Sequence, residues 1–170
     1  VIVIGGSTDD LSLLATLLKG ATSDSPGTLV ILQGEQPAPD KMLKKLLDNP
    51  ALTVVQAENG QELKRGMIVL APIDEHIVLK RCERAYKIKR VKGPMIAGQR
   101  PSINVLFKSA ASAAGPRANG LLLSSSGLDG QDGQRELLQA GATVLTHFSE
   151  KESLEFLERC RQRAKTVKAG

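Results

Sequence analysis

The chain has 170 residues, 41% of them hydrophobic, and a net charge of +5, which fits a single folded domain with a substantial core. It lacks the run of about 18 apolar residues that a membrane span needs, so we expect no membrane insertion. Cys82 and Cys160 lie far apart in the sequence, so we expect reduced thiols, no metal site and a cytoplasmic protein. The chain begins with Val1 and no Met, which suggests a piece excised from a longer protein.

The first predicted unit is a strand, a turn and a helix. Val1–Ile4 is a β-branched run typical of a buried parallel strand, Gly5–Thr8 predicts a tight turn, and Leu11–Leu18 carries apolar residues at helical spacing. This order places Ser7 at the carboxyl edge of a sheet, beside the free N–H groups of a helix N-terminus. Ser7 then fits a nucleophile with an oxyanion-binding backbone, part of an anion cradle, or a simple helix cap.

Strands and helices alternate through the rest of the chain. Further strands are predicted at Thr28–Gln33, Leu52–Gln56, Gly120–Ser124 and Ala142–Thr146, and further helices over about 37–50, 101–114, 134–140 and 150–168. In the last helix Leu154, Leu157, Cys160 and Ala164 recur at helical spacing. The alternation predicts a single α/β domain over residues 1–170, three-layered and doubly wound, with a mostly parallel sheet.

The alternation is interrupted in the middle of the chain. Met67–Ala71, Ile77–Lys80 and Ala85–Lys89 are strand-like runs without a helix between them, which predicts an antiparallel hairpin or meander inserted over about 67–90. Because Tyr86 is the only aromatic residue there, we expect a solvated face or an acidic protein partner, and no nucleic acid. This segment concentrates basic residues: Lys80, Arg81, Arg84, Lys87, Lys89, Arg90 and Lys92.

Three polar loops follow predicted strands and should meet at one sheet edge: Gly5–Asp10, Gly34–Gln36 and Ser125–Gly133. Ser7 and Asp129 are therefore candidates for two members of a Ser-His-Asp triad, although an Asp in a loop is more often a turn or cap residue. Such a triad needs an imidazole between the two, which takes the serine proton and is oriented by the carboxylate.

Four segments resemble the catalytic domain of the chemotaxis protein-glutamate methylesterases. GGST at 5–8 is similar to the nucleophile turn of that family, and APIDEHIVL at 71–79 to its hairpin. GPMIAGQRPSINVLFKSAA at 93–111 is close to the entry of its long helix, and LSSSGLDG at 123–130 to the loop of its catalytic Asp. The resemblance runs in order from Val1 to about Leu145.

The resemblance implies roles for individual residues. Ser7 matches the nucleophile, Asp129 the orienting carboxylate, and Thr8 and Ser126 the positions whose backbone N–H groups face the oxyanion. Members place the catalytic His directly after the Gln that ends the second strand, but here Gly34 follows Gln33. The chain also departs from the family at Asp9-Asp10, where Gly-Gly is usual, at Ser126, where Met is usual, and at Asn104, where Asp is usual.

Two functions remain from these residues. The first is a methylesterase-like signalling domain, inactive or very weak, whose partner is a chemoreceptor helical bundle, another chemotaxis signalling protein or a receiver domain of the same full-length chain. The alternative is an active methylesterase in which His147, after the last predicted strand, replaces the missing base; we expect His76 to be structural. Neither function requires a cofactor, and the GGST turn lacks the patterns of nucleotide-binding loops.

Overall fold

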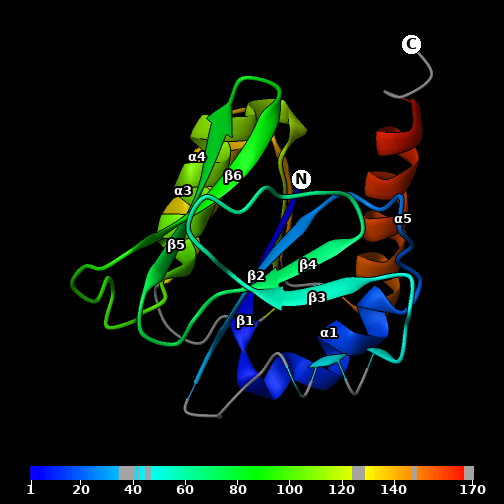
Figure 1. Cartoon of the computed structure of the whole chain (residues 1–170), viewed down its shortest axis with the longest axis horizontal. Coiled ribbons are helices and arrows are strands. Elements are labelled where there is room, and N and C mark those ends of the chain that lie inside the picture. Colours follow the sequence, from blue (N-terminus) through cyan, green and yellow to red (C-terminus); the bar gives the residue numbers. More distant parts are fainter. Residues whose placement is uncertain (35–40, 42, 45–46, 124–128, 147–148, 167–170) are drawn as a thin grey trace.

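The computed structural model describes residues 1–34, 41, 43–44, 47–123, 129–146 and 149–166. Within that part, the main sheet has six strands in the order β3-β4-β2-β1-β7-β8, all paired in parallel (Figure 1). These strands are β1 (Ile2–Ser7), β2 (Thr28–Gln33), β3 (Thr53–Gln56), β4 (Met67–Leu70), β7 (Asn119–Leu122) and β8 (Thr143–Thr146). The predicted α/β fold with a mostly parallel sheet is confirmed.

Helices cover both faces of the sheet, because the central strands are apolar on both sides. Alternate residues of β1 enter different cores: Val3 packs with α3, and Ile4 with α1 and α5. Figure 1 shows α5 and α1 together, apart from α3, α4 and the hairpin. The helices are α1 (Leu11–Leu18), α3 (Ile103–Ala114), α4 (Gln131–Gln139) and α5 (Glu150–Thr166), with short 3-10 turns η1 (Thr8–Asp10) and η2 (Gly115–Arg117).

The register of the two central strands brings distant polar residues to one edge. β1 and β2 pair residue for residue from Ile2 opposite Thr28 to Ser7 opposite Gln33. The carboxyl ends of both strands therefore lie side by side, so Ser7 and Gln33 are at one edge of the sheet, as expected. The amino ends of the same strands lie about 17 Å away, given about 3.3 Å per strand residue.

One predicted strand belongs to a different sheet. Met67–Ala71 was expected in the inserted hairpin, but β4 lies in the main sheet, paired in parallel with β2 and β3. The hairpin contains only β5 (His76–Cys82) and β6 (Ala85–Val91). The connection from β3 to β4 has no helical pattern because it runs along β6 instead, where Leu63 N–H donates to Tyr86 O over 2.9 Å.

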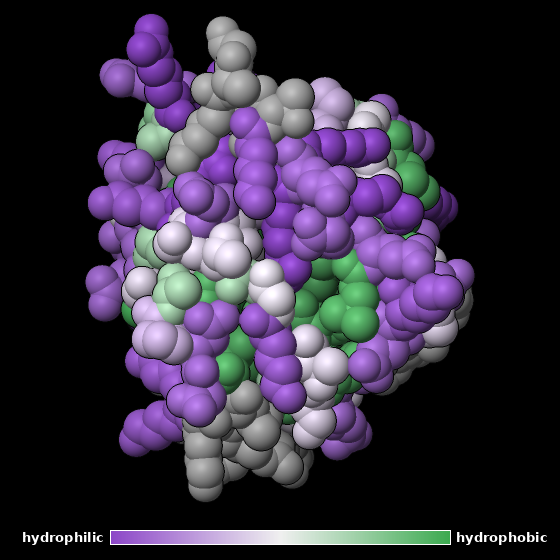
Figure 2. Space-filling view, turned by 90° about the vertical axis from the view of Figure 1, so that its right-hand side faces the viewer, coloured by the Kyte–Doolittle hydropathy of each residue, from purple (hydrophilic) through white to green (hydrophobic). Residues whose placement is uncertain are grey.

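The last helix buries Leu157 and Cys160 of the expected stripe, together with Phe156 in place of Leu154. Phe156, Leu157 and Cys160 lie in the core shared with α1, whereas Leu154 is 40% exposed. Hydrophilic side chains cover most of the face that carries α5, around a smaller hollow lined by hydrophobic ones (Figure 2). Of the helix expected over 37–50, the described residues Leu43 and Leu47 are buried, and the remainder lies outside the described part. Among described residues, no helix is long and apolar enough to cross a membrane.

Candidate functional site

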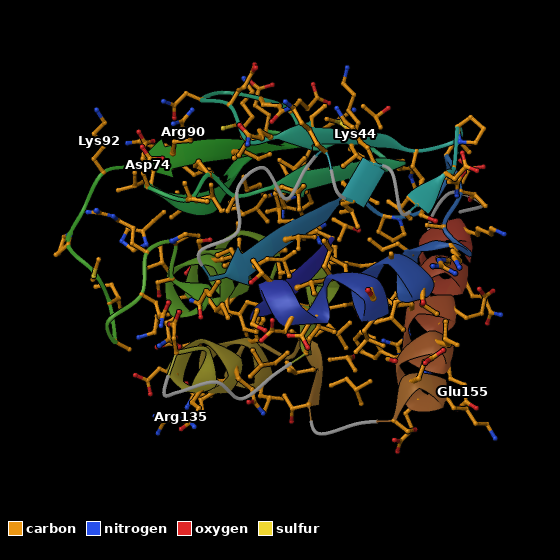
Figure 3. All side chains as sticks on the ribbon, turned by 90° about the horizontal axis from the view of Figure 1, so that it is seen from below. Lys44, Asp74, Arg90, Lys92, Arg135 and Glu155 are labelled. Carbon is orange, nitrogen blue, oxygen red and sulfur yellow. The ribbon has the colours of Figure 1, made fainter. Side chains whose placement is uncertain are left out.

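The candidate site occupies the carboxyl edge of the sheet. Figure 3 shows the molecule from below, relative to the view of Figure 1. Ser7 ends β1 and caps the turn that follows: its Oγ accepts from Asp9 N–H over 3.2 Å, and its own N–H donates to Asp10 Oδ2 over 2.8 Å. This confirms the interpretation of Ser7 as a helix cap. Asp9 and Asp10 place negative charge in the first turn after Ser7, which stabilises a helix N-terminus. Ser7 remains half-buried at the edge where a substrate would enter.

Asp129 is buried, with 5% of its surface exposed, and both carboxylate oxygens are fully used. Oδ1 accepts from Ser102 Oγ over 2.8 Å and from Asn104 N–H over 3.0 Å. Oδ2 accepts from Ile103 N–H over 2.7 Å and from Gln33 Nε2 over 2.5 Å. Because a carboxylate offers about four lone-pair sites, Asp129 is saturated by these donors and closes the N-terminus of α3.

Gln33 joins the two halves of the site. Its backbone lies opposite Ser7 in the β1–β2 ladder, and its amide nitrogen donates both to Asp129 Oδ2 and to Pro101 O, the latter over 3.0 Å. The amide therefore makes the contact with Asp129 that an imidazole would make in a triad. Sequence reasoning used Gln33 only as a landmark; its polarity at the end of an otherwise apolar, buried strand was the available signal.

Gly34 has a backbone that suits glycine. Its φ is +143°, a region that other residues adopt rarely, and a Cβ built there would overlap Oγ1 of Thr8. A side chain at the position that the family resemblance assigns to the general base would therefore be strained by the conformation of the turn and would have to displace the Thr8 hydroxyl.

His76 is structural, as expected. It is 3% exposed, its Nδ1 accepts from Ser102 N–H over 3.1 Å, and its Nε2 lies 2.8 Å from Pro94 O. An accepting Nδ1 requires the proton on Nε2, which then donates to the Pro94 carbonyl. Both ring nitrogens are occupied in holding the start of α3, so His76 has no nitrogen left for a proton from Ser7.

The remaining predicted site residues are only partly placed. Thr8 lies in η1 directly after Ser7, while Ser126 and His147 fall outside the described residues. Asn104 is buried, and its Oδ1 accepts from Gly133 N–H over 2.7 Å, which ties α3 to α4. Among the described residues, no group of three or more His, Cys, Asp or Glu side chains fits a metal ion.

The hairpin presents one basic face. Lys80 lies directly opposite Lys87, Lys89 lies opposite Val78, and all three lysines are exposed. Like charges opposite one another in an antiparallel pair destabilise it, so a partner with negative charge would relieve this face. Arg90 faces differently: its Nε donates to Glu75 Oε2 in an ion pair of 2.8 Å. In Figure 3, Arg90, Lys92 and Asp74 gather at one end of the molecule, far from Glu155 on α5.

Comparisons with known proteins agree with this architecture. The chain is 35% identical over 154 residues to a protein-glutamate methylesterase/protein-glutamine glutaminase of Sulfurimonas denitrificans, covering 91% of this chain and 44% of that protein. A protein of the same name from Geobacter metallireducens is 34% identical over 146 residues, with coverages of 85% and 41%. The chain thus spans less than half the length of these relatives.

A solved structure matches nearly the whole chain. The Thermotoga maritima CheB methylesterase catalytic domain aligns with a TM-score of 0.80, 22% identity and 97% coverage of both chains, which supports the fold. The model of the family described as CheB methylesterase matches residues 2–156 of this chain. The chain therefore belongs to the CheB methylesterase family.

Proposed function

We propose that this domain is a methylesterase-family binding module that recognises a methylated chemoreceptor, or another protein of the same signalling system, and hydrolyses esters at most very slowly. The observation that carries the proposal is the glycine after Gln33. A serine hydroxyl needs a base to accept its proton, and loss of one triad member lowers the rate by about 10⁴–10⁶. Glycine offers no such base at this position.

The hydrogen bonds of Asp129 support the same proposal. In a working triad this carboxylate orients an imidazole, but here Gln33 and the first turn of α3 take all its hydrogen-bonding capacity. The surrounding charge is also unfavourable for ester hydrolysis, because Asp9 and Asp10 follow the candidate nucleophile directly. Their negative charge opposes the oxyanion that forms when a serine attacks an ester.

The basic hairpin face supports the binding role. Chemoreceptor segments that carry glutamate side chains are acidic where these are not methylated, and Lys80, Lys87 and Lys89 gather positive charge on one face of the hairpin, with Glu62 opposite Lys87. An electrostatic contact of this kind accelerates association and weakens with salt. Because Arg90, on the other face of the hairpin, is paired with Glu75, the lysines are the residues to test.

The alternative is a slow but active methylesterase that uses Ser7, Asp129 and a base from elsewhere, with His147 as the candidate. The β8 strand ends at Thr146 on the same edge of the sheet as Ser7, and this placement favours His147 over His76. Binding and hydrolysis are separated by titrating a methylated chemoreceptor fragment, labelled with a fluorophore, and recording anisotropy before any product forms. The proposal expects saturable binding by wild type and by Ser7→Ala alike; absence of binding by both would contradict it.

A further inference from the structure

A second concave site lies at the opposite end of the sheet from Ser7. It is a cavity of about 770 Å³, bounded by the amino ends of the central strands at Val1, Gly27 and Asn119. The tip of the hairpin forms one wall and the C-terminal half of α5 another. Figure 1 shows these two elements on either side of the N-terminus. None of the residues assigned to the methylesterase site lines this cavity.

The charge of the cavity is its main feature. Five arginines from four separate parts of the chain line it, without a lysine or a carboxylate among the lining residues: Arg65, Arg81, Arg84, Arg117 and Arg163. Arg65 donates to Asp24 O over 2.8 Å. In the part of the chain that the structure describes, the other four form no ion pair with a carboxylate. Among the described residues, the fold thus collects the guanidinium groups of Arg81, Arg84, Arg117 and Arg163 here without a carboxylate paired to them.

The floor of the cavity is apolar. Leu63, Pro26, Val1 and the half-buried ring of Tyr86 contribute to it, beside the buried thiol of Cys160. A cavity that combines an apolar floor with a few placed polar groups, at a volume between about 300 and 1,000 Å³, is typical of sites for small molecules. The residues that the family resemblance assigns to ester hydrolysis lie at the opposite edge of the sheet, so we assign this cavity no role in that reaction.

We infer that this cavity binds a small phosphate compound with several negative charges and a flat or apolar body, the chemical class of nucleotides. Guanidinium groups match phosphate oxygens in a bidentate geometry and stack on flat rings. Leaving Arg65 aside, the four other arginines exceed what a single carboxylate would neutralise, which favours a di- or triphosphate over a fatty acid. Tyr86 and the apolar floor would receive the base. This inference stands independently of the proposed function.

The test is isothermal titration calorimetry of the intact chain with ATP and GTP, beside tripolyphosphate and adenosine. We expect a nucleotide to bind with a dissociation constant below about 100 µM, tripolyphosphate at least tenfold more weakly, and adenosine undetectably. Because Tyr86 is the only tyrosine, ring-labelled tyrosine gives one set of NMR signals, which should shift on binding and so place the ligand in this cavity.

Matched variants decide whether the arginines carry the binding. Arg84→Gln with Arg117→Gln removes two exposed guanidinium groups, one at the hairpin tip and one in η2, and should weaken nucleotide binding at least tenfold. Arg100→Gln with Arg135→Gln removes the same charge outside the cavity and should leave it unchanged. The inference is overturned if neither nucleotide binds at about 1 mM, if tripolyphosphate binds as tightly as a nucleotide, or if both double variants weaken binding equally. Binding of an aspartate-rich peptide in place of nucleotides would also overturn it.

Discussion

Gln33 donates its side-chain amide to Oδ2 of Asp129 over 2.5 Å, and this contact connects strand β2 to the loop before α4. The two residues are 96 positions apart in the sequence. In a Ser-His-Asp triad the carboxylate would face an imidazole; here it faces an amide that has no basic nitrogen to offer. The site consequently retains a serine and a carboxylate that serve helix capping.

The first prediction concerns Asp129 as a structural residue. Asp129→Ala leaves buried donors of Ser102, Ile103 and Asn104 without their acceptor, and each unsatisfied group costs about 1–3 kcal/mol. We therefore expect the free energy of unfolding, measured by urea titration, to fall by at least about 3 kcal/mol. Asp132→Ala, on the exposed surface of α4, serves as control and should cost less than about 1 kcal/mol. If Asp129→Ala left the free energy of unfolding unchanged, the carboxylate would not have a structural role.

The second prediction concerns Gly34. Gly34→Ala forces a side chain into a φ of +143° and into contact with the Thr8 hydroxyl, so we expect a loss of stability of about 1–3 kcal/mol. Thr8→Ala removes the hydroxyl and should recover part of that loss in the double variant, by about 1 kcal/mol of coupling in thermal unfolding. Additive effects would mean that Thr8 does not restrict this position. A His restored at position 34 should accordingly require a change at Thr8 as well.

The third prediction concerns the hairpin lysines. Replacing Lys80, Lys87 and Lys89 with Gln should weaken binding of a methylated chemoreceptor fragment at least tenfold at low salt, and the difference should disappear as salt screens the charges. A triple variant with the same change of charge, at the exposed Lys19, Lys44 and Lys151, should bind like wild type. If both triple variants lost the same affinity, the effect would be one of net charge alone. If the hairpin variant lost no affinity, the lysine face would not be the binding surface.

The fourth prediction concerns the two thiols. Burial raises the pKa of Cys160 to about 11, while Cys82 is exposed on the hairpin. Iodoacetamide at neutral pH should therefore label Cys82 and spare Cys160 in the folded protein, as mass spectrometry of tryptic peptides would show. Labelling of Cys160 at the rate of Cys82 would contradict its burial in the core with α1.

The raised pKa of Cys160 also predicts a dependence of stability on pH. The folded state holds the thiol proton more tightly than the unfolded chain, whose thiol has a pKa near 9, so this stabilisation is complete below about pH 9 and is lost as pH rises toward 11. Two pKa units correspond to about 2 kcal/mol at pH 11. The free energy of unfolding should thus fall more between pH 9 and 11 in wild type than in Cys160→Ala; equal slopes would argue against it.

Much of the fold was predictable because its signals are local. The apolar run Thr28–Gln33 is a strand at the predicted residues, and the apolar spacing of α1 and α3 matched their buried faces. The strand β4 was placed wrongly because the connection before it lacks a helix, and no local signal distinguishes a parallel partner from a hairpin. In α5, helical spacing predicted that Leu154 is buried, but Leu154 is exposed and Phe156 is buried instead.

The site could be predicted only in part, because its key contacts join residues far apart in sequence. Spacing indicated that Ser7, Gly34 and Asp129 meet at one edge, yet not that Asp129 accepts from α3 or that Gln33 reaches it. The pairing of Arg90 with Glu75 was equally unpredicted, because the two residues are 15 positions apart and lie on different sides of the hairpin turn. Such contacts depend on the packing of the hairpin and α3 on the sheet.

The most direct test of the account is methanol release from a methylated chemoreceptor fragment by wild type and Ser7→Ala. The Geobacter metallireducens relative named above, assayed in parallel, confirms that the fragment is a substrate. The account predicts that wild type and Ser7→Ala give the same background rate. Turnover by wild type that is lost in Ser7→Ala would contradict it and identify an esterase with an unusual base, in which case His147→Ala should abolish the activity as well.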